Sequence, residues 1–337
     1  FNLTTYPDAQ VGWIPYLAGA IRSELKSGQY DVLLTSAPPF SANIAVALSN
    51  PPIPWVADMR DPWANTVPID SFPLRPQLDR FLEFRTLQRA AAFTAASQPM
   101  AAHFGRRLRK PYHGITNAFD AREWNDVPFD TADRCTFVYA GQLYRGRLDP
   151  SPLFSAVRRL LDVGRIGAAD LAIDFYCTPS PWLRETIERY GLSSIVSVHA
   201  FRSREEIMHI ERRADRLLLF LWDGLGSDAI IPGKVFEYLG ARRRMLAVSG
   251  PVYSAVDDVL SHSAAGTRVR DETATAREVL LAVNEYRERR TRIVDQQCVA
   301  PYEAREMARQ FDGVLRSVMP AGGAVSTNLP PVVRLPS

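Results

Sequence analysis

The sequence predicts an α/β fold with two Rossmann-like, doubly wound parallel-sheet domains, the second complete and the first short. Short apolar runs alternate with amphipathic stretches along the chain. Strands that are apolar on both faces are typical of a parallel sheet covered by helices. A polar stretch at residues 118–134 separates two such series and indicates a linker. The 337 residues, of which 46% are hydrophobic and 23% charged, suit two globular domains.

The first series contains three expected strands joined by helices. We expect strands at 30–36, 54–59 and 93–97, and helical segments that end at residue 25 and cover 41–49 and 77–92. Alternation of short apolar strands with helical segments predicts βαβ units and therefore a parallel sheet.

The second series begins after the polar stretch. We expect strands at 136–140, 172–176, 194–199, 216–221 and 244–248, and helices at 152–161, 181–190, 204–213 and 233–241. Five such repeats are enough for a complete doubly wound domain. A last helical stretch covers 301–318, and the glycine- and proline-rich residues 320–337 predict a disordered tail.

Composition and charge exclude several classes of protein. The 40 basic and 37 acidic residues leave a net charge of +3, which is too small to indicate nucleic-acid binding. Cys135, Cys177 and Cys298 are too few and too far apart for a disulfide framework or a zinc site, and they favour a reducing compartment. The longest apolar run, residues 217–222, is far shorter than the ~20 residues of a membrane-spanning helix. With no recognisable signal peptide, a cytoplasmic location is expected.

The most informative segment is residues 227–240, SDAIIPGKVFEYLG, which follows a buried strand and opens a helix. The N-terminus of such a helix offers unpaired N–H groups and a positive dipole end, which suit a phosphate. Lys234 adds a cation in the first turn, and Glu237 follows on the same helical face, where its carboxylate can accept hydrogen bonds from sugar hydroxyls. The alternative, a surface ion pair between Lys234 and Glu237, has about equal weight on spacing alone.

Five segments resemble, in the correct order, the motifs of family-4-type glycosyltransferases of the GT-B fold. Residues 231–250, IPGKVFEYLGARRRMLAVSG, resemble the donor-site segment, whose usual form is P-x-K-x-x-E-Y followed by a strand. The other four are YDVLLTSAPPF at 30–40, WVADMRDPW at 55–63, ITNAFD at 115–120 and FVYAG at 137–141. They resemble the strand before a Ser-Pro-Pro turn, the D-x-R-D-x-W segment, the N-G-x-D before the interdomain crossing, and the strand and glycine turn that open the donor domain. Together they are specific for the family, not for a substrate.

The resemblance implies a GT-B fold in which two Rossmann-like domains face a cleft. Residues 1–125 would form the acceptor-side domain, 134–300 the nucleotide-sugar domain, and 301–319 a helix that packs back on the first domain. The implied activity is retaining transfer of a sugar from a nucleotide-diphosphate sugar to a hydroxyl, in surface polysaccharide or glycolipid biosynthesis. The acceptor would be a saccharide or a lipid-linked saccharide, and no metal or other cofactor is expected.

Carried over position by position, the resemblance gives the donor-site residues their roles. Glu237 would bind the ribose hydroxyls, and Lys234, with Arg145 or Arg147 after the glycine turn, would neutralise the diphosphate as it leaves. The residues assigned to catalysis are Lys234, Glu237 and Arg145, and those assigned to donor binding are Gly141, Arg147, Asp228, Ile231, Pro232, Gly233, Lys234 and Glu237. For the two arginines, solvated loop positions are an alternative of about equal weight.

Two positions depart from the family pattern. Ala229 stands where many relatives carry a glutamate that faces the transferred sugar; Asp228, or the backbone N–H groups of 229–231, are candidate substitutes. Asn117-Ala118 replaces an Asn-Gly pair. A non-catalytic nucleotide-sugar-binding or scaffold protein, which Ala229 favours, and a GT-B sugar-nucleotide epimerase are therefore alternatives to a transferase.

A second group of candidates belongs to the acceptor side or the cleft. It comprises Asp58, Arg60, Asp61 and Trp63, which follow a predicted strand, and His199 at another strand end. Ligands of open α/β sheets bind at such ends. The alternative for the first four, of equal weight, is an internal Asp–Arg pair with the tryptophan packed beneath it. The histidines show no metal-ligand spacing, so no metal site is expected.

Two further expectations concern the membrane and the N-terminus. The basic residues Arg106, Arg107, Arg109 and Lys110, beside Phe104 and Leu108, are a candidate for peripheral docking on the inner face of the membrane, although a solvated helix end is favoured. The chain opens on Phe1, whereas relatives begin with a strand and a glycine-rich loop that faces the donor phosphates. We therefore expect that the first domain lacks its first strands and that the chain as given could be inactive.

Overall fold

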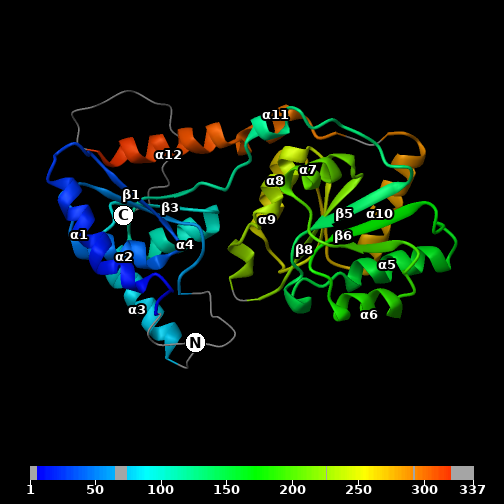
Figure 1. The fold of residues 1–337 in the computed structure, drawn as a ribbon, viewed down its shortest axis with the longest axis horizontal. Coiled ribbons are helices and arrows are strands. Elements are labelled where there is room, and N and C mark those ends of the chain that lie inside the picture. The colour runs from blue at the N-terminus through cyan, green and yellow to red at the C-terminus, as the bar shows by residue number, and fades with distance from the viewer. Residues whose placement is uncertain (1–5, 65–73, 225, 291–292, 320–337) are drawn as a thin grey trace. The chain divides into compact units, whose positions relative to one another are not determined.

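The computed structural model describes residues 6–64, 74–224, 226–290 and 293–319. The chain divides into two compact units (Figure 1). Unit 1 takes its described residues from 1–117, 229–231 and 305–337, and unit 2 from 118–228 and 232–304. Each unit has its own parallel sheet and hydrophobic core, which confirms the expected α/β architecture.

Unit 1 is built on a parallel sheet. Its described strands, in spatial order, are β1 (Leu33–Ala37), β2 (Trp55–Met59), β3 (Ala92–Ala95) and β4 (Tyr112–Gly114). Ser36 of β1 and Thr94 of β3 are in register with Asp58 of β2. Three polar side chains are therefore placed side by side near the carboxyl ends of the strands.

Helices cover both faces of this sheet. The described helices of unit 1 are α1 (Ile14–Leu25), α2 (Phe40–Ser49), α3 (Arg75–Leu87), α4 (Gln98–Leu108) and α12 (Ala304–Val318). Trp55, Ala57 and Met59 of β2 join the core with α2 and α4, whereas Val56 joins Val314 of α12. Because successive side chains of a strand point to opposite faces, α12 covers the face away from α2 and α4, as Figure 1 shows.

Unit 2 has a larger parallel sheet. Its described strands are β5 (Cys135–Ala140), β6 (Leu171–Tyr176), β7 (Val196–His199), β8 (Arg216–Leu221), β9 (Met245–Ser249) and β10 (Gly266–Val269). Their spatial order, β7-β6-β5-β8-β9-β10, is the order 3-2-1-4-5-6 of a Rossmann sheet counted from β5. The order reverses between β5 and β8, and ligands of such sheets bind outside the carboxyl ends of the strands at this point.

The helices of unit 2 lie on both faces of its sheet. They are α5 (Ser151–Asp162), α6 (Pro181–Arg189), α7 (Arg204–Arg213), α8 (Lys234–Ala241), α9 (Ala255–Ser263), α10 (Glu272–Arg287) and α11 (Gln296–Val299). Figure 1 shows α7, α8 and α9 on one face and α5 and α10 on the other. In the core, the rings of Phe175 and Phe220 stack 6.0 Å apart, and Tyr139 lies 5.1 Å from Phe220. These contacts fix β5, β6 and β8 relative to one another.

The structure also contains elements that the sequence patterns did not predict. They are β4, α4, α9, β10, α10 and α11. The segment 118–134, which was expected to be a linker, contains the turn Ala121–Trp124. Trp124 is buried against Gly240, where an added Cβ would lie 2.2 Å from the indole nitrogen. A single large aromatic side chain thus packs a segment whose composition is otherwise polar.

The expected C-terminal tail and the expected absence of a membrane-spanning helix concern segments outside the two sheets. The expected tail, 320–337, lies outside the described residues. Among the helices that the structure describes, none is both long enough and apolar enough to cross a membrane.

Candidate functional site

A pocket of about 310 Å³ lies in unit 2 beside the carboxyl end of β5, next to the point where the strand order reverses. Its walls come from the ends of β5 and β6, the loop after β7, α7, and the first turn of α8. The lining residues are Trp124, Ala140, Gly141, Tyr176, Phe201, Arg202, Arg204, Ile207, Met208, Glu211, Lys234 and Glu237. The pocket therefore brings together three of the residues predicted from the sequence, namely Gly141, Lys234 and Glu237.

Lys234 lies directly against the turn that follows β5. Gly141 has a φ of +147°, and a Cβ added there would lie 2.0 Å from Lys234 Nζ. The backbone conformation favours glycine, and a side chain at this position would have to displace the ammonium group. Burial lowers the pKa of Lys234, while the neighbouring Glu237 and Glu211 raise it. The pocket thus contains a half-buried cation held against the backbone.

The helix that carries Lys234 and Glu237 is anchored through its other face. Val235, Phe236 and Tyr238 are buried, and the Tyr238 hydroxyl donates a hydrogen bond to the Leu218 carbonyl of β8 (3.1 Å). With these side chains packed against the sheet, Lys234 and Glu237 face the pocket. Within the described residues, Glu237 forms its ion pair with Arg204 and not with Lys234.

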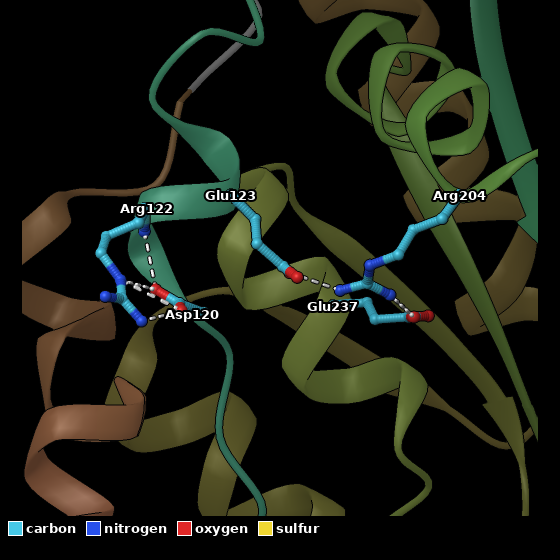
Figure 2. A network of polar contacts seen from close by, with 5 residues as sticks. All are labelled: Asp120, Arg122, Glu123, Arg204 and Glu237. Atoms are coloured by element: carbon cyan, nitrogen blue, oxygen red, sulfur yellow. Dashed lines mark hydrogen bonds and ion pairs between the residues drawn. The ribbon is translucent and has the colours of Figure 1, made fainter.

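Arg204, the first residue of α7, bridges two carboxylates, as Figure 2 shows. Its Nη1 donates to Glu237 Oε1 (3.0 Å) and its Nη2 donates to Glu123 Oε2 (2.6 Å). Both interactions raise the pKa of Arg204. Among the described residues, Glu237 has a hydrogen-bond partner only at Oε1. The second oxygen of Glu237 is therefore available as an acceptor.

A neighbouring pair fixes the segment that supplies Glu123. Arg122 Nη2 lies 2.7 Å from Asp120 Oδ2, and the Arg122 backbone N–H donates to Asp120 Oδ1 (2.9 Å) (Figure 2). These bonds lower the pKa of Asp120 to about 2. Asp120 therefore stays ionised and caps the turn that presents Glu123 to Arg204.

Glu211, in the last turn of α7, is a further carboxyl group of the pocket wall. The residue is 1% exposed, and within the described structure its Oε1 has no hydrogen-bond partner. Burial raises the pKa of Glu211 to about 8, and the charge of Glu237 acts in the same direction, whereas Lys234 and Arg204 lower it. These surroundings therefore favour the neutral form of Glu211.

The remaining wall combines aromatic and basic side chains. Phe201 and Arg202 are exposed in the loop after β7, and Tyr176 ends β6. The Tyr176 ring stacks on His199 at 4.6 Å, and His199 Nε2 lies 3.1 Å from Asp174 Oδ1. His199 itself does not line this pocket. Its expected place in a cleft stays a prediction.

Other predicted donor-site residues lie outside the pocket lining. Arg147 is exposed and its guanidinium lies 3.6 Å from the centroid of the Trp222 ring, whereas the side chain of Arg145 falls outside the described structure. Asp228 and Gly233 are exposed, Pro232 is half-buried and Ile231 is buried. In the part of the chain described, no group of three His, Cys, Asp or Glu side chains could hold a metal ion.

In unit 1 the structure shows the internal Asp–Arg pair. Arg60 Nε and Nη2 donate to the two carboxylate oxygens of Asp58 (2.7 and 2.5 Å), and the hydroxyls of Ser36 and Thr94 also donate to this carboxylate (2.9 and 2.6 Å). Trp63 is buried and stacks on Phe40 at 4.9 Å. Asp58, Arg60 and Trp63 thus stabilise the end of β2.

Two other predicted surface features of unit 1 can be compared with the structure. Asp61, the fourth residue of the acceptor-side group, is exposed. In the candidate membrane patch, Phe104 is buried in the core and Arg107 pairs with the buried carboxylate of Glu83. The patch therefore has no exposed phenylalanine, and the favoured interpretation of a solvated helix end fits α4 better.

Sequence reasoning missed Arg204 and Glu211, although it predicted their helix with the correct bounds. The signal was present in the spacing. Arg204, Ile207, Met208 and Glu211 follow the i, i+3, i+4, i+7 pattern of one helical face. A helical face that carries an arginine and a glutamate at its two ends indicates that this side of the helix is not packed entirely against the hydrophobic core.

No family model and no curated protein matches the sequence, whereas solved structures do. A glycosyltransferase from Rickettsia africae ESF-5 has a TM-score of 0.63 at 12% identity, covering 92% of this chain and 82% of that one. Sucrose-phosphate synthase from Thermosynechococcus elongatus has a TM-score of 0.66 at 12% identity, with 94% and 81% covered. Anabaena Alr3699/HepE in complex with UDP-glucose has a TM-score of 0.59 at 13% identity, with 90% and 82% covered. At these identities the likeness shows the fold, which is GT-B with two Rossmann-like units.

Proposed function

We propose that the protein is a glycosyltransferase that moves a sugar from a nucleotide-diphosphate sugar to a hydroxyl acceptor. The observation that carries the proposal is the pocket in which the cation Lys234 and the acceptor Glu237 face one cavity beside the Gly141 turn. A nucleotide diphosphate presents both groups that such a pocket can bind, namely an anion and a ribose diol. The named neighbours, which are a glycosyltransferase, a sucrose-phosphate synthase and a protein in complex with UDP-glucose, support this choice.

In this proposal Glu237 accepts hydrogen bonds from the ribose hydroxyls. Its Oε1 is held by Arg204, which is itself held by Glu123, so that Oε2 remains available as an acceptor. Hydrogen bonds to a carboxylate are stronger than those between neutral groups. Arg204 is then a positioning residue, because it acts on the ligand through Glu237.

Lys234 would stabilise the negative charge that grows on the diphosphate when its bond to the sugar breaks. Preorganised charge in a site that excludes water is commonly the largest contribution to catalysis. Because Gly141 has no side chain, the Lys234 ammonium group can lie directly against the turn after β5. Arg147, and Arg145 next to it, are candidates for additional phosphate contacts.

The sugar end and the acceptor are assigned by the resemblance of the motifs. Asp228, or the backbone N–H groups of 229–231, are proposed to bind the sugar in place of the missing glutamate. Ile231, Pro232 and Gly233, which precede α8, are proposed to contribute to donor binding. Asp61 of unit 1 is the exposed acceptor-side candidate. Retention of configuration, a family-4-type mechanism without metal, and an acceptor from surface polysaccharide or glycolipid biosynthesis belong to the same proposal.

Calorimetric titration of the full-length protein with UDP-glucose tests the donor site. Lys234→Met and Glu237→Gln should each weaken binding about tenfold or more, because a hydrogen bond to a charged group contributes about 1.5–3 kcal/mol. Glu205→Gln is the matched control, since Glu205 is an exposed carboxylate beside Arg204 on α7. It should bind as the wild type does.

The outcomes separate the proposal from its alternatives. Failure of the wild-type protein to bind any UDP- or GDP-sugar would contradict it. If binding occurs, a sugar-nucleotide epimerase converts the nucleotide sugar without an acceptor, whereas a transferase shows at most slow hydrolysis until an acceptor is added. A scaffold protein binds the nucleotide sugar and converts it under neither condition.

A further inference from the structure

Glu211 has a place in the pocket wall that the roles of Lys234 and Glu237 do not explain. Its carboxyl group lines the same cavity from α7, while the other two residues line it from α8. The side chain is almost fully buried, and one of its oxygens has no hydrogen-bond partner in the described structure. A buried polar atom without a partner destabilises a protein. The described residues supply no partner for this oxygen, and a ligand that reached it from the pocket would satisfy it.

The groups around Glu211 determine its charge. From α8 it faces Lys234, Glu237 and the buried Tyr238, and from its own helix it faces Arg204. Strand β5, which packs on α7, carries no charged side chain along Cys135–Ala140. An ionised carboxylate in these surroundings would lie beside the negative charge of Glu237 with one oxygen unpaired.

We propose that Glu211 is a further donor-site residue, which binds the nucleotide-diphosphate sugar as a neutral carboxylic acid that donates its proton to an oxygen of the ligand in a hydrogen bond. This inference rests on the proposed function of the pocket. A carboxylate at this position would repel the anionic diphosphate, whereas the protonated group offers it a donor. A protein molecule whose Glu211 is ionised before binding therefore takes up one proton from solvent when the ligand binds.

The sign of the pH dependence follows from linkage. The pKa of Glu211 in the free protein is about 8, and an anionic ligand raises it further. Affinity is then highest below pH 8 and falls as the pH rises through this value. Proton uptake on binding therefore increases from pH 6.5 to pH 8.

Titration calorimetry with UDP-glucose in pairs of buffers that differ in ionisation enthalpy measures this uptake. UDP-glucose is suitable because its diphosphate diester stays ionised throughout this range. We expect uptake at pH 8 in the wild type and in Glu205→Gln, whose carboxylate is exposed on the same helix. In Glu211→Gln, which remains neutral at every pH, the uptake disappears and the decline of affinity above pH 8 becomes smaller.

The possible results distinguish this inference from the proposed function. No binding of nucleotide sugars at any pH would overturn the proposed function itself. Binding by the wild type without proton uptake at pH 8 overturns the role of Glu211, and this result needs no variant to fold. Uptake that persists in Glu211→Gln also overturns it, because another group, such as Lys234, then titrates.

Discussion

At Gly141 the backbone turns with a φ of +147°, and Lys234 Nζ occupies the space where a side chain would begin. The position of the Lys234 ammonium group therefore depends on the absence of a Cβ atom at Gly141. We expect Gly141→Ala to lower the free energy of unfolding by about 1–3 kcal/mol through backbone strain. It should also displace the ammonium group and weaken UDP-glucose binding. Thermal unfolding and calorimetric titration measure the two effects separately.

Gly164→Ala is the matched control for this prediction. Gly164 also has a positive φ, +63°, but a Cβ there would meet no atom within 4 Å. Both variants should lose stability, and only Gly141→Ala should lose affinity for the nucleotide. Equal affinity of the two variants would show that Lys234 does not depend on the turn.

The sequence placed Asp58 and Arg60 at the end of a strand but could not decide between a ligand site and an internal pair. The deciding partners, Ser36 and Thr94, belong to neighbouring strands and become adjacent only through the register of the sheet. For Lys234 and Glu237 the helical spacing already showed that both side chains share one face. Local periodicity could therefore predict that Lys234 and Glu237 share one helical face, whereas the partners of Asp58 follow only from the register of the sheet.

Helix α7 supplies one wall of the pocket, and its N-terminus sets the position of Arg204. Ser203 Oγ accepts a hydrogen bond from the Glu206 N–H (3.2 Å), and Glu206 Oε2 accepts one from the Ser203 N–H (2.9 Å). This is a capping box. Ser203→Ala should destabilise the protein by about 1 kcal/mol, because an N-cap acceptor is lost.

The same capping box predicts a pH dependence. Hydrogen bonds from Ser203 lower the pKa of Glu206 in the folded protein. Stabilisation by a group with a lowered pKa is present above its unfolded value and is lost as the pH falls through the folded value. The difference in Tm between wild type and Ser203→Ala should therefore be smaller below about pH 4 than at pH 7. A difference that is equal at both pH values would contradict the contribution of Glu206.

Elements differed in how well the sequence predicted them. Strand β8 (Arg216–Leu221) is buried along its whole length, so its apolar run stands out, and α7 begins at a serine cap. In contrast, β10 (Gly266–Val269) has a single buried residue, and β4 (Tyr112–Gly114) has only three residues. Edge strands of this kind depend on pairing with a neighbour rather than on their own pattern. The central strands were therefore predictable, and so were the edge strands β1 and β7, whereas the edge strands β4 and β10 were not.

At the scale of the whole molecule, the strand order of unit 2 connects the fold to the site. The sequence indicated that the strands are parallel, but their order depends on long-range pairing that local patterns do not contain. Once β5 and β8 are neighbours, the turn after β5 and the helix after β8 meet at one end of the sheet. Gly141 and Lys234, which are distant in sequence, come into contact for this reason.

Every residue that lines the pocket belongs to unit 2. A bound nucleotide should therefore stabilise unit 2. Ligand at a concentration 100 times its Kd stabilises the folded state that binds it by about 2.7 kcal/mol. With UDP-glucose in this excess, amide hydrogen exchange should slow at the turn after β5, the loop after β7 and the first turns of α7 and α8. Exchange in β1 to β4 should not change, because no residue of these strands lines the pocket.

The Glu237→Gln variant at the same ligand concentration is the control and should show little protection. Slowed exchange in unit 1 alone would instead place the nucleotide site outside this pocket.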